Sequence, residues 1–309
     1  MNKKIAITAG DFNGIGPEII IKALNRLNIS ENNVVLIGAS SLFKGLNKYY
    51  ETIEIPFDEN WLCVGKETAE AGEFSYNCLL KACEMAKAGQ INAIVTAPVS
   101  KNALHLAGHD FSGQTEVLEA NLADSSKDEQ AEMVFVAGDF RVLLLSRHVA
   151  LKDVRITKEL LVEKISRINR VLKNNFGIAN PKIALCSLNP HAGENGILGC
   201  EEKDIFVPAI QCLRGSGVAV TDPMPSDTLF VKAAKAYLDK QPQPYDVYCA
   251  CYHDQGLIPI KVLAMDKTVN MTAGLSIIRT SPAHGTAYDI AGKGIADESS
   301  MICAIKQVI

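Results

Sequence analysis

Three of the six histidines in the sequence each stand just after a run of apolar residues. They are His148, His191 and His253, and each run has the length and composition of a buried β-strand. In an open α/β sheet, functional loops gather at the carboxyl ends of the strands. Imidazole nitrogens are common ligands of divalent metal ions, so the shared position predicts one metal site with three histidine ligands. For any one of these histidines alone, an ordinary loop or core histidine is the competing interpretation.

The segment that contains His253 carries further groups suited to chemistry. Asp254 follows directly, Gly256 predicts a turn, and Lys261 comes soon after. A lysine close to a metal cation has a lowered pKa, which suits proton transfer near neutral pH. Asp227 is a further candidate for proton transfer. The competing interpretation of each of these residues alone is a solvated surface charge.

Two other parts of the sequence are suited to binding anions. Lys261, Asn270 and Arg279 offer charge and hydrogen-bond donors to a phosphate group. Residues 10–18 form a glycine-rich turn that opens a helix, and exposed N–H groups at a helix start bind anions or a cofactor amide. The turn matches neither the usual dinucleotide fingerprint nor a P-loop.

The expected elements alternate between strands and helices, which predicts an α/β fold with mostly parallel sheets. Gly138-Asp139 joins two short strands as a hairpin, which suggests that a second domain has begun. We expect strands at 3–9, 34–38, 61–64, 93–98, 133–137, 141–145, 182–187 and 246–251, and helices at 17–27, 40–48, 73–88, 157–173, 201–214 and 226–239. Ser100 is expected to cap a further helix, and another is expected to follow residues 111–116 and to end at about Ala123. After Lys261 the chain is expected to return to the first domain, so that this domain comprises 1–108 plus 266–309 and the second 109–265.

Bulk composition excludes several classes of protein. A net charge of −4 and a pI near 5.9 argue against nucleic acid as a partner, because that needs a basic face. No apolar run approaches the roughly 18 residues of a membrane span, and the N-terminal apolar stretch is too short for a signal peptide. We therefore expect a cytoplasmic protein. Nine cysteines without a C-x-x-C pair indicate reduced thiols, with Cys63, Cys186, Cys249 and Cys251 expected in buried strands.

Several strings in this sequence resemble the 4-hydroxythreonine-4-phosphate dehydrogenase family of vitamin B6 (pyridoxine) biosynthesis. They occur in family order over nearly the whole chain, and the tail formed by residues 284–296 also resembles isopropylmalate and isocitrate dehydrogenases. The strings are Gly14-Ile-Gly-Pro-Glu18, Thr96-Ala-Pro-Val99, Leu188-Asn-Pro-His-Ala-Gly-Glu194, Asp227-Thr-Leu-Phe230, Tyr252-His-Asp-Gln-Gly256, and Ile278-Arg-Thr-Ser281 with His284-Gly-Thr-Ala287.

The resemblance implies a two-domain dehydrogenase of the isocitrate/isopropylmalate dehydrogenase-like fold, with its active site in the interdomain cleft. It implies a homodimer that shares a divalent metal (Zn, Mg or Co) between subunits, with the three histidines above as ligands. Lys261, Asp254 and Asp227 are the expected catalytic groups. The expected substrate-binding residues are Gln114, Thr115, Lys261, Asn270 and Arg279, and the expected NAD-binding residues are Gly274, Leu275, His284, Gly285, Thr286 and Asp289.

The implied reaction is the NAD-dependent oxidation of the secondary alcohol of 4-phosphooxy-L-threonine. The resulting 3-oxo acid loses CO2 to give 3-amino-2-oxopropyl phosphate. A carboxylate at Asp289 has its own physical argument, because it accepts hydrogen bonds from both ribose hydroxyls and repels a 2′-phosphate. That favours NAD over NADP.

Two departures from the family pattern bear on the substrate. Gln114 stands where the family has a substrate-contacting histidine, and Gln keeps a donor and an acceptor but cannot become cationic. Residues 10–13 read Gly-Asp-Phe-Asn where Gly-Asp-Pro-Ala is usual. A dehydrogenase of a sugar-acid phosphate, D-threonate or D-erythronate 4-phosphate, is therefore an alternative. A phosphate acyltransferase on a related fold and a binding protein without activity are the others.

Overall fold

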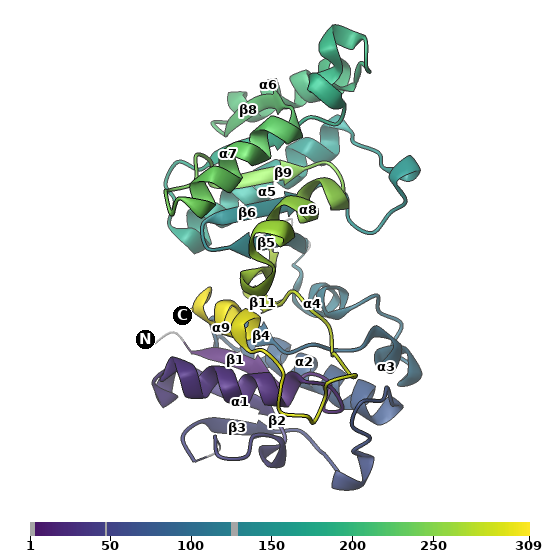
Figure 1. Cartoon of the computed structure of the whole chain (residues 1–309), viewed down its shortest axis with the longest axis vertical. Helices are drawn as coiled ribbons and strands as arrows, with labels where there is room; N and C mark the ends of the chain where they lie inside the picture. Colours follow the sequence, from purple (N-terminus) through teal and green to yellow (C-terminus); the bar gives the residue numbers. More distant parts are fainter. Residues whose placement is uncertain (1–3, 47, 125–128) are drawn as a thin grey trace. The chain divides into compact units, whose positions relative to one another are not determined.

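The computed structural model describes residues 4–46, 48–124 and 129–309, which form two compact units. Unit 1 comprises residues 1–131 and 269–309, and unit 2 comprises residues 132–268. Both chain ends belong to unit 1, as expected for a tail that returns to the first domain (Figure 1). The segment 109–131 also belongs to unit 1, so the boundary falls at the hairpin instead of at residue 109. Residue 3 of the expected first strand and residues 125–128 lie outside the described residues.

Unit 1 is built on a sheet with the strand order β3-β2-β1-β4-β11-β10. Its neighbours are parallel except for β10 and β11, which pair antiparallel. Its elements are β1 (Ile5–Thr8), α1 (Gly16–Leu27), β2 (Val34–Gly38), β3 (Glu51–Glu54), α2 (Ala69–Lys87), β4 (Ala93–Thr96), α3 (Lys101–Leu106), α4 (Gln114–Leu122), β10 (Val269–Ala273), β11 (Ile278–Pro282) and α9 (Ser299–Lys306).

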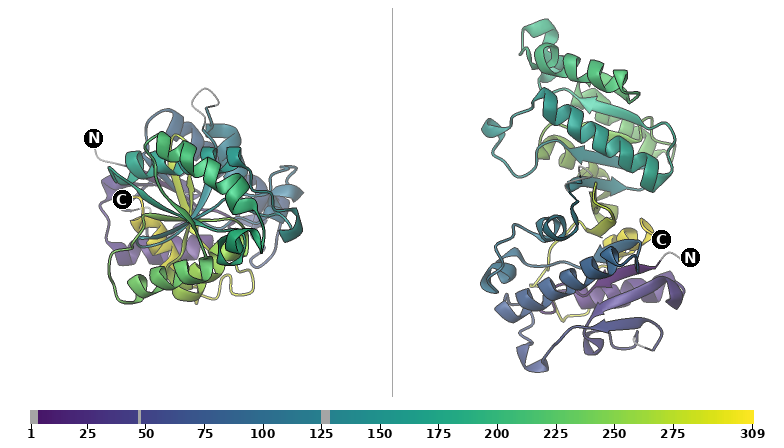
Figure 2. Two further views of the ribbon diagram at one scale, coloured as in Figure 1. Left: turned by 90° about the horizontal axis from the view of Figure 1, so that it is seen from above. Right: turned by 180° about the vertical axis from the view of Figure 1, so that it is seen from behind.

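Helices cover both faces of the unit 1 sheet. α1 packs against α9 on the face toward the viewer in Figure 1, and α2 covers the other face, seen in the right panel of Figure 2. α1 buries Ile19, Ile20, Ala23 and Leu24, a spacing that places them on one side of a helix. The start of α3 is capped as expected, because Ser100 Oγ accepts a hydrogen bond from Ala103 N at 3.1 Å.

Unit 2 has the strand order β5-β6-β9-β7-β8, parallel from β6 onward. The expected hairpin at Gly138 joins β5 to β6, and α5 with α6 lies on one face while α7 and α8 lie on the other (Figures 1 and 2). Its elements are β5 (Glu132–Ala137), β6 (Phe140–Leu144), α5 (Lys158–Phe176), β7 (Lys182–Cys186), a π-helical turn (Glu202–Phe206), α6 (Val207–Gly215), β8 (Ala219–Met224), α7 (Ser226–Leu238), β9 (Val247–Ala250) and α8 (His253–Ala264).

Two local expectations in unit 1 were wrong. The strand expected at 61–64 is instead the end of a 3-10 turn and a loop in which Cys63 is exposed; the strand is β3, whose charged residues hid it. The helix expected at 40–48 is a 3-10 turn at Ser40–Leu42, and Gly45 takes a left-handed φ of 89° that interrupts a helix. No helix in the described ranges is long and apolar enough to cross a membrane.

Candidate functional site

The three histidines follow three neighbouring parallel strands of unit 2. His148 comes after β6, His253 begins α8 directly after β9, and His191 lies in the turn after β7. Because β6 pairs with β9 and β9 pairs with β7, all in parallel, the carboxyl ends of these strands share one edge of the sheet. The predicted shared context of the three histidines is therefore present in the fold.

Two polar side chains that sequence reasoning missed tie these strand ends together. Ser146 donates to the carbonyl of Cys251 at 2.7 Å. Gln255 accepts from Cys251 N at 2.6 Å and donates to the carbonyl of Ser187 at 2.8 Å. The loops that carry the three histidines are thus cross-linked by hydrogen bonds. Nothing in the local sequence distinguishes Ser146 or Gln255 from ordinary loop residues.

His148 and His253 lie side by side. Their ring centroids are 5.6 Å apart, and both line a cavity of about 270 Å³. His253 Nδ1 is 2.7 Å from Asp254 Oδ1, so the carboxylate accepts the Nδ1 proton and leaves Nε2 as the nitrogen that can bind a ligand. A carboxylate in this position is the usual partner of a metal-binding histidine, because it selects the tautomer and orients the ring.

His191 lies in an unusual turn that spans Pro190–Gly196. Residues 191–195 all have positive φ, and the buried carboxylate of Glu202 holds the start of the turn. Glu202 accepts from Leu188 N at 2.9 Å, from Asn189 N at 2.8 Å and from the Asn189 side chain at 2.9 Å. Among the described residues, no three His, Cys, Asp or Glu side chains gather closely enough to hold a metal ion. The three-histidine metal site therefore stays a prediction.

Helix α8 carries the proton-transfer candidates that follow His253. The turn predicted at Gly256 was wrong: Gly256 lies inside the helix, where an added Cβ would come within 2.8 Å of the Leu144 and Val142 side chains. This glycine permits close packing of α8 on β6. Asp254 and Lys261 are seven residues apart and so face the same side of α8, about 10 Å apart along its axis.

Asp227 lies in the first turn of α7, next to α8. Asp227 and Asp254 both line a cavity of about 480 Å³ whose other walls are mostly apolar side chains of the two helices. The carboxylates of Asp227 and Asp254 thus line the same cavity. Both are exposed, so they remain accessible to a ligand or to solvent.

In unit 1, Arg279 is the most deeply buried basic residue among those that the structure describes. Its side chain is 3% exposed, and Nε and Nη2 donate to Thr96 Oγ1 at 2.8 and 2.6 Å, with Thr272 Oγ1 at 3.5 Å from Nη1. Among the residues that the structure describes, no carboxylate is hydrogen-bonded to Arg279. Burial lowers the pKa of Arg279 to about 9, and the charge of Glu116 opposes that shift. A buried cation bonded only to hydroxyl groups is suited to binding an anion.

Three of the other predicted substrate-binding residues lie near Arg279. Thr115 Oγ1 is 3.4 Å from Thr272 Oγ1, and Asn270 shares a face of β10 with Thr272. Gln114 donates through Nε2 to the carbonyl of Ala97 at 3.2 Å, an interaction that only its amide nitrogen can make. Gln114 Oε1 and Asn270 Oδ1 are buried without a hydrogen-bond partner. These acceptors call for a ligand that donates hydrogen bonds. Lys261 belongs to unit 2.

The segment predicted to bind NAD begins at the turn between β10 and β11, where Gly274 has a φ of 86° and Leu275 is buried. It continues in the loop after β11. His284 Nδ1 donates to the carbonyl of Gly285 at 3.0 Å, and the carbonyl of Thr286 accepts from Ile15 N at 3.0 Å. The Asp289 side chain is exposed, so it can accept hydrogen bonds from a ligand.

A buried acid lies beneath this loop. Asp11 is fully buried and accepts a hydrogen bond from Tyr288 Oη at 2.5 Å. Burial raises the pKa of Asp11 above 3.8, although the bonds from Tyr288 and Asn13 N oppose the shift. Burial and the neighbouring carboxylate also raise the pKa of Tyr288. Sequence reasoning missed both residues, because a phenol and a carboxylate 277 residues apart meet only in the fold.

The raised pKa of Asp11 predicts a pH-dependent effect of Asp11→Asn. Ionisation of a group whose pKa is raised by folding costs stability, so the wild-type protein loses stability as pH rises through the folded pKa. The free energy of unfolding of Asp11→Asn relative to the wild type should therefore increase as pH is raised from 4 to 7. Denaturant unfolding at several pH values measures it, with Asp110→Asn, an exposed aspartate of unit 1, as the control. A difference that does not change with pH would contradict this expectation.

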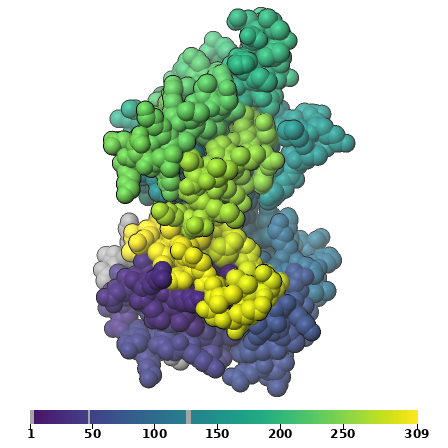
Figure 3. Space-filling model, viewed as in Figure 1, coloured from purple at the N-terminus to yellow at the C-terminus, as the bar shows by residue number. Residues whose placement is uncertain are grey.

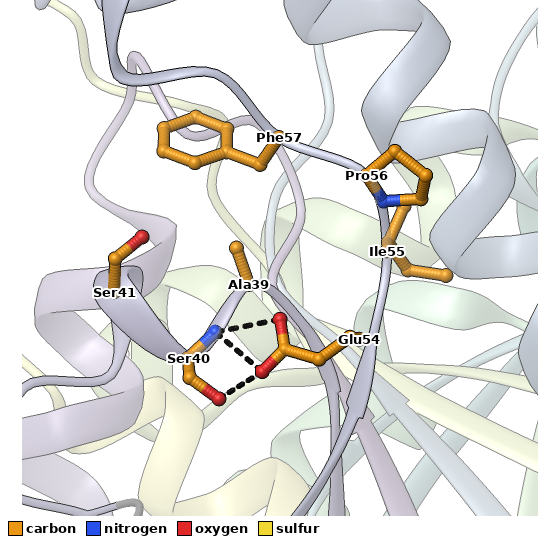
Figure 4. Close-up of a pocket in the computed structure, with 7 residues that line it drawn as sticks. All are labelled: Ala39, Ser40, Ser41, Glu54, Ile55, Pro56 and Phe57. Atoms are coloured by element: carbon orange, nitrogen blue, oxygen red, sulfur yellow. Dashed lines mark hydrogen bonds between the residues drawn. The ribbon is translucent and has the colours of Figure 1, made fainter.

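A further cavity of about 450 Å³ lies where β2 and β3 end (Figure 4). Glu54 is one of its lining residues, and the Glu54 carboxylate accepts from the backbone N–H of Ser40 at 3.1 and 3.2 Å and from the Ser40 hydroxyl. None of the predicted site residues lines this cavity. The carboxylate of Glu54 is engaged within the protein, so we assign no role to it.

A protein-family model described as "Pyridoxal phosphate biosynthetic protein PdxA" matches residues 13–308. The chain belongs to this family. It is 40% identical over 326 residues to the 4-hydroxythreonine-4-phosphate dehydrogenase of Sulfurihydrogenibium sp. (strain YO3AOP1), covering 99% of this chain and 97% of the relative. It is 39% identical over 329 residues to the D-threonate 4-phosphate dehydrogenase of Salmonella typhimurium (98% and 97% covered).

A solved structure of a 4-hydroxythreonine-4-phosphate dehydrogenase from Klebsiella pneumoniae superposes with a TM-score of 0.86 at 36% identity, covering 100% of this chain and 97% of the other. The predicted family and the predicted α/β fold class are thereby confirmed. This PdxA family member is a dehydrogenase, an oxidoreductase that acts on a hydroxyl group, as are the relatives by name. The relatives carry two different substrate names, so family membership leaves the substrate to be argued from the site.

Proposed function

We propose that this PdxA family member oxidises 4-phosphooxy-L-threonine with NAD to the 3-oxo acid, which decarboxylates to 3-amino-2-oxopropyl phosphate in pyridoxal phosphate biosynthesis. The observation that carries the proposal is Arg279, a buried guanidinium whose hydrogen-bond partners are hydroxyl groups. A phosphate or carboxylate supplies the negative charge that such a cation needs. Gln114 and Asn270 supply acceptors for donor groups of the same substrate.

A divalent metal fits the histidines of unit 2. His148 and His253 are adjacent, and Asp254 leaves His253 Nε2 available, as a metal ligand requires. Imidazole nitrogens favour zinc or cobalt over magnesium, which prefers oxygen ligands. When bound, the metal would acidify the substrate hydroxyl and stabilise negative charge on its oxygen. His191 would be the third ligand, and sharing of the metal between subunits would bring a partner chain to this edge of the sheet.

Within that arrangement, the carboxylate of Asp254 orients the ring of His253. Lys261, on the same side of α8, is the candidate to take and return the proton, with Asp227 as the alternative. NAD would accept the hydride and would lie along Gly274–Asp289, where the exposed Asp289 carboxylate favours a free 2′-hydroxyl over a 2′-phosphate.

A homodimer is the form in which we propose that the enzyme acts, in the cytoplasm. Supporting the dimer, α7 and α8 expose large apolar side chains beside the cavity that Asp227 lines: Val231 is 66%, Ile258 60% and Val262 81% exposed. Exposed apolar side chains that cluster on one face commonly mark a protein–protein interface.

The alternative substrates are D-threonate and D-erythronate 4-phosphate, and Gln114 is the observation that favours them. Its amide orientation is set by Ala97, so it presents an oxygen that accepts a hydrogen bond at any pH. That oxygen can bind a substrate hydroxyl as well as an ammonium group.

A panel of substrates tests the proposal. We expect kcat/KM with NAD to be highest for 4-phosphooxy-L-threonine and activity to be lost in EDTA. Gln114→His restores the histidine of the family pattern and should lower KM for 4-phosphooxy-L-threonine. A preference for a sugar-acid phosphate would replace the proposed substrate with the alternative. Acyl transfer that is insensitive to EDTA would contradict the dehydrogenase mechanism altogether.

A further inference from the structure

The loop after β11 is anchored to the loop after β1 at Thr286 and Tyr288. Ile15 N donates to the carbonyl of Thr286 at 3.0 Å, and Tyr288 Oη donates to Asp11 at 2.5 Å. At Gly14 the two loops touch so closely that an added Cβ would lie 2.8 Å from the Thr286 carbonyl oxygen. Figure 3 shows the yellow C-terminal segment lying on the purple N-terminal segment.

The residue between the two anchors is strained. Ala287 has a φ of 45°, in the left-handed region that residues other than glycine avoid. Such a conformation persists where its surroundings over-determine it, and it tends to occur at functional sites. Here Thr286 and Tyr288 are both fixed. Asp289, the next residue, is therefore presented from a loop whose backbone is set by these contacts.

Asp11 is the centre of a junction of three loops. Its second oxygen, Oδ1, accepts from Asn13 N at 2.9 Å. Asn13 in turn holds residues 63–65, because its side chain accepts from Cys63 N at 2.7 Å and its carbonyl accepts from Gly65 N at 2.8 Å. Asn13 lies in the 10–13 turn that departs from the family pattern. Burying the carboxylate of Asp11 costs stability, and buried ionisable groups with shifted pKa values are concentrated at functional sites.

We infer that the hydrogen bond between Asp11 and Tyr288 positions Thr286 and Asp289 to bind the adenosine ribose of NAD. The inference rests on the proposed NAD site along Gly274–Asp289. Asp11 and Tyr288 are positioning residues, because they act through the loop that they hold. A loop that is ordered before binding spares the ligand the entropic cost of ordering it, and that saving appears as affinity.

Tyr288→Phe tests the inference, because it removes one hydroxyl and keeps the ring. We expect Kd for NAD to rise about tenfold, equivalent to the loss of one good hydrogen bond. KM for the phosphorylated substrate and kcat at saturating NAD should stay at the wild-type values. Trp61, the one tryptophan of the sequence, contacts Phe57, which contacts Phe12 beside Asp11. Its fluorescence therefore provides a binding measurement that is independent of activity.

Tyr50→Phe is the matched control. Tyr50 Oη donates to the Ile29 carbonyl at 3.0 Å in the same unit, so this variant also loses a phenolic hydrogen bond. It should leave Kd for NAD unchanged, and an equal Kd in Tyr288→Phe and Tyr50→Phe overturns the inference. In a double-mutant cycle of Tyr288→Phe and Asp11→Ala, the losses of NAD affinity should be non-additive. The double variant should have about the same Kd for NAD as whichever single variant binds NAD more weakly. Additive losses also overturn it. If the wild type does not bind NAD, the proposed cofactor and this inference both fail.

Discussion

His253→Ala is expected to lower metal-dependent turnover by more than about a hundredfold, because the loss of even a supporting partner of a metal ligand costs ten- to a hundredfold. The variant should remain folded. His253 lies at the start of α8 with a side chain that is 39% exposed, and Asp254, to which it is hydrogen-bonded, is also exposed. Removing the imidazole therefore leaves no buried cavity.

Three measurements separate the expected outcomes for His253→Ala. Metal per chain should fall, turnover should fall with it, and the midpoint of thermal unfolding in EDTA should match that of the wild type. His105→Ala is the control, since His105 is exposed on α3 of unit 1. Wild-type turnover with a normal metal content in His253→Ala would refute the assignment of His253 as a ligand.

Arg279→Met is expected to raise KM for the phosphorylated substrate by about a hundredfold, or about 3 kcal/mol, the range found when one partner of a buried charge pair is removed. The free energy of unfolding should hold or rise, because in the free protein the guanidinium is buried without a carboxylate hydrogen-bonded to it in the described part of the chain. Weaker binding without lower stability distinguishes a binding role from a structural one.

Steady-state kinetics together with denaturant unfolding measure both quantities. The matched control is Arg26→Met in the same unit, whose side chain is 68% exposed and pairs with Glu298. It should leave KM unchanged. A loss of stability in Arg279→Met with an unchanged KM would show that Arg279 supports the fold and does not bind the substrate.

Much of the fold was predictable because its signals are local. Buried strands are short apolar runs, helices start at residues such as Ser100, and the hairpin at Gly138 has a distinctive turn. The errors arose where the local signal was weak. β3 is a charged edge strand without an apolar run. Gly256 resembles a turn residue in the sequence, but in the structure it permits close packing of α8 on β6.

For the site, the order of residues along the chain predicts which chemical groups are available: three histidines that follow strands, Asp254, Asp227 and, in unit 1, Arg279. How these groups are held depends on contacts between elements that are distant in the sequence. The parallel pairing of β6, β9 and β7 brings the histidine loops to one edge, and Ser146, Gln255 and Glu202 fix those loops.

The contact between Asp11 and Tyr288 is the clearest case of what the sequence does not reveal. Its partners come from opposite ends of the chain, and nothing in the local sequence around either residue indicates that the two side chains meet. A hydrogen bond depends on a distance and an angle in space, which the order of residues along the chain does not determine. Residue identity sets the chemistry that is available, and packing decides which groups meet.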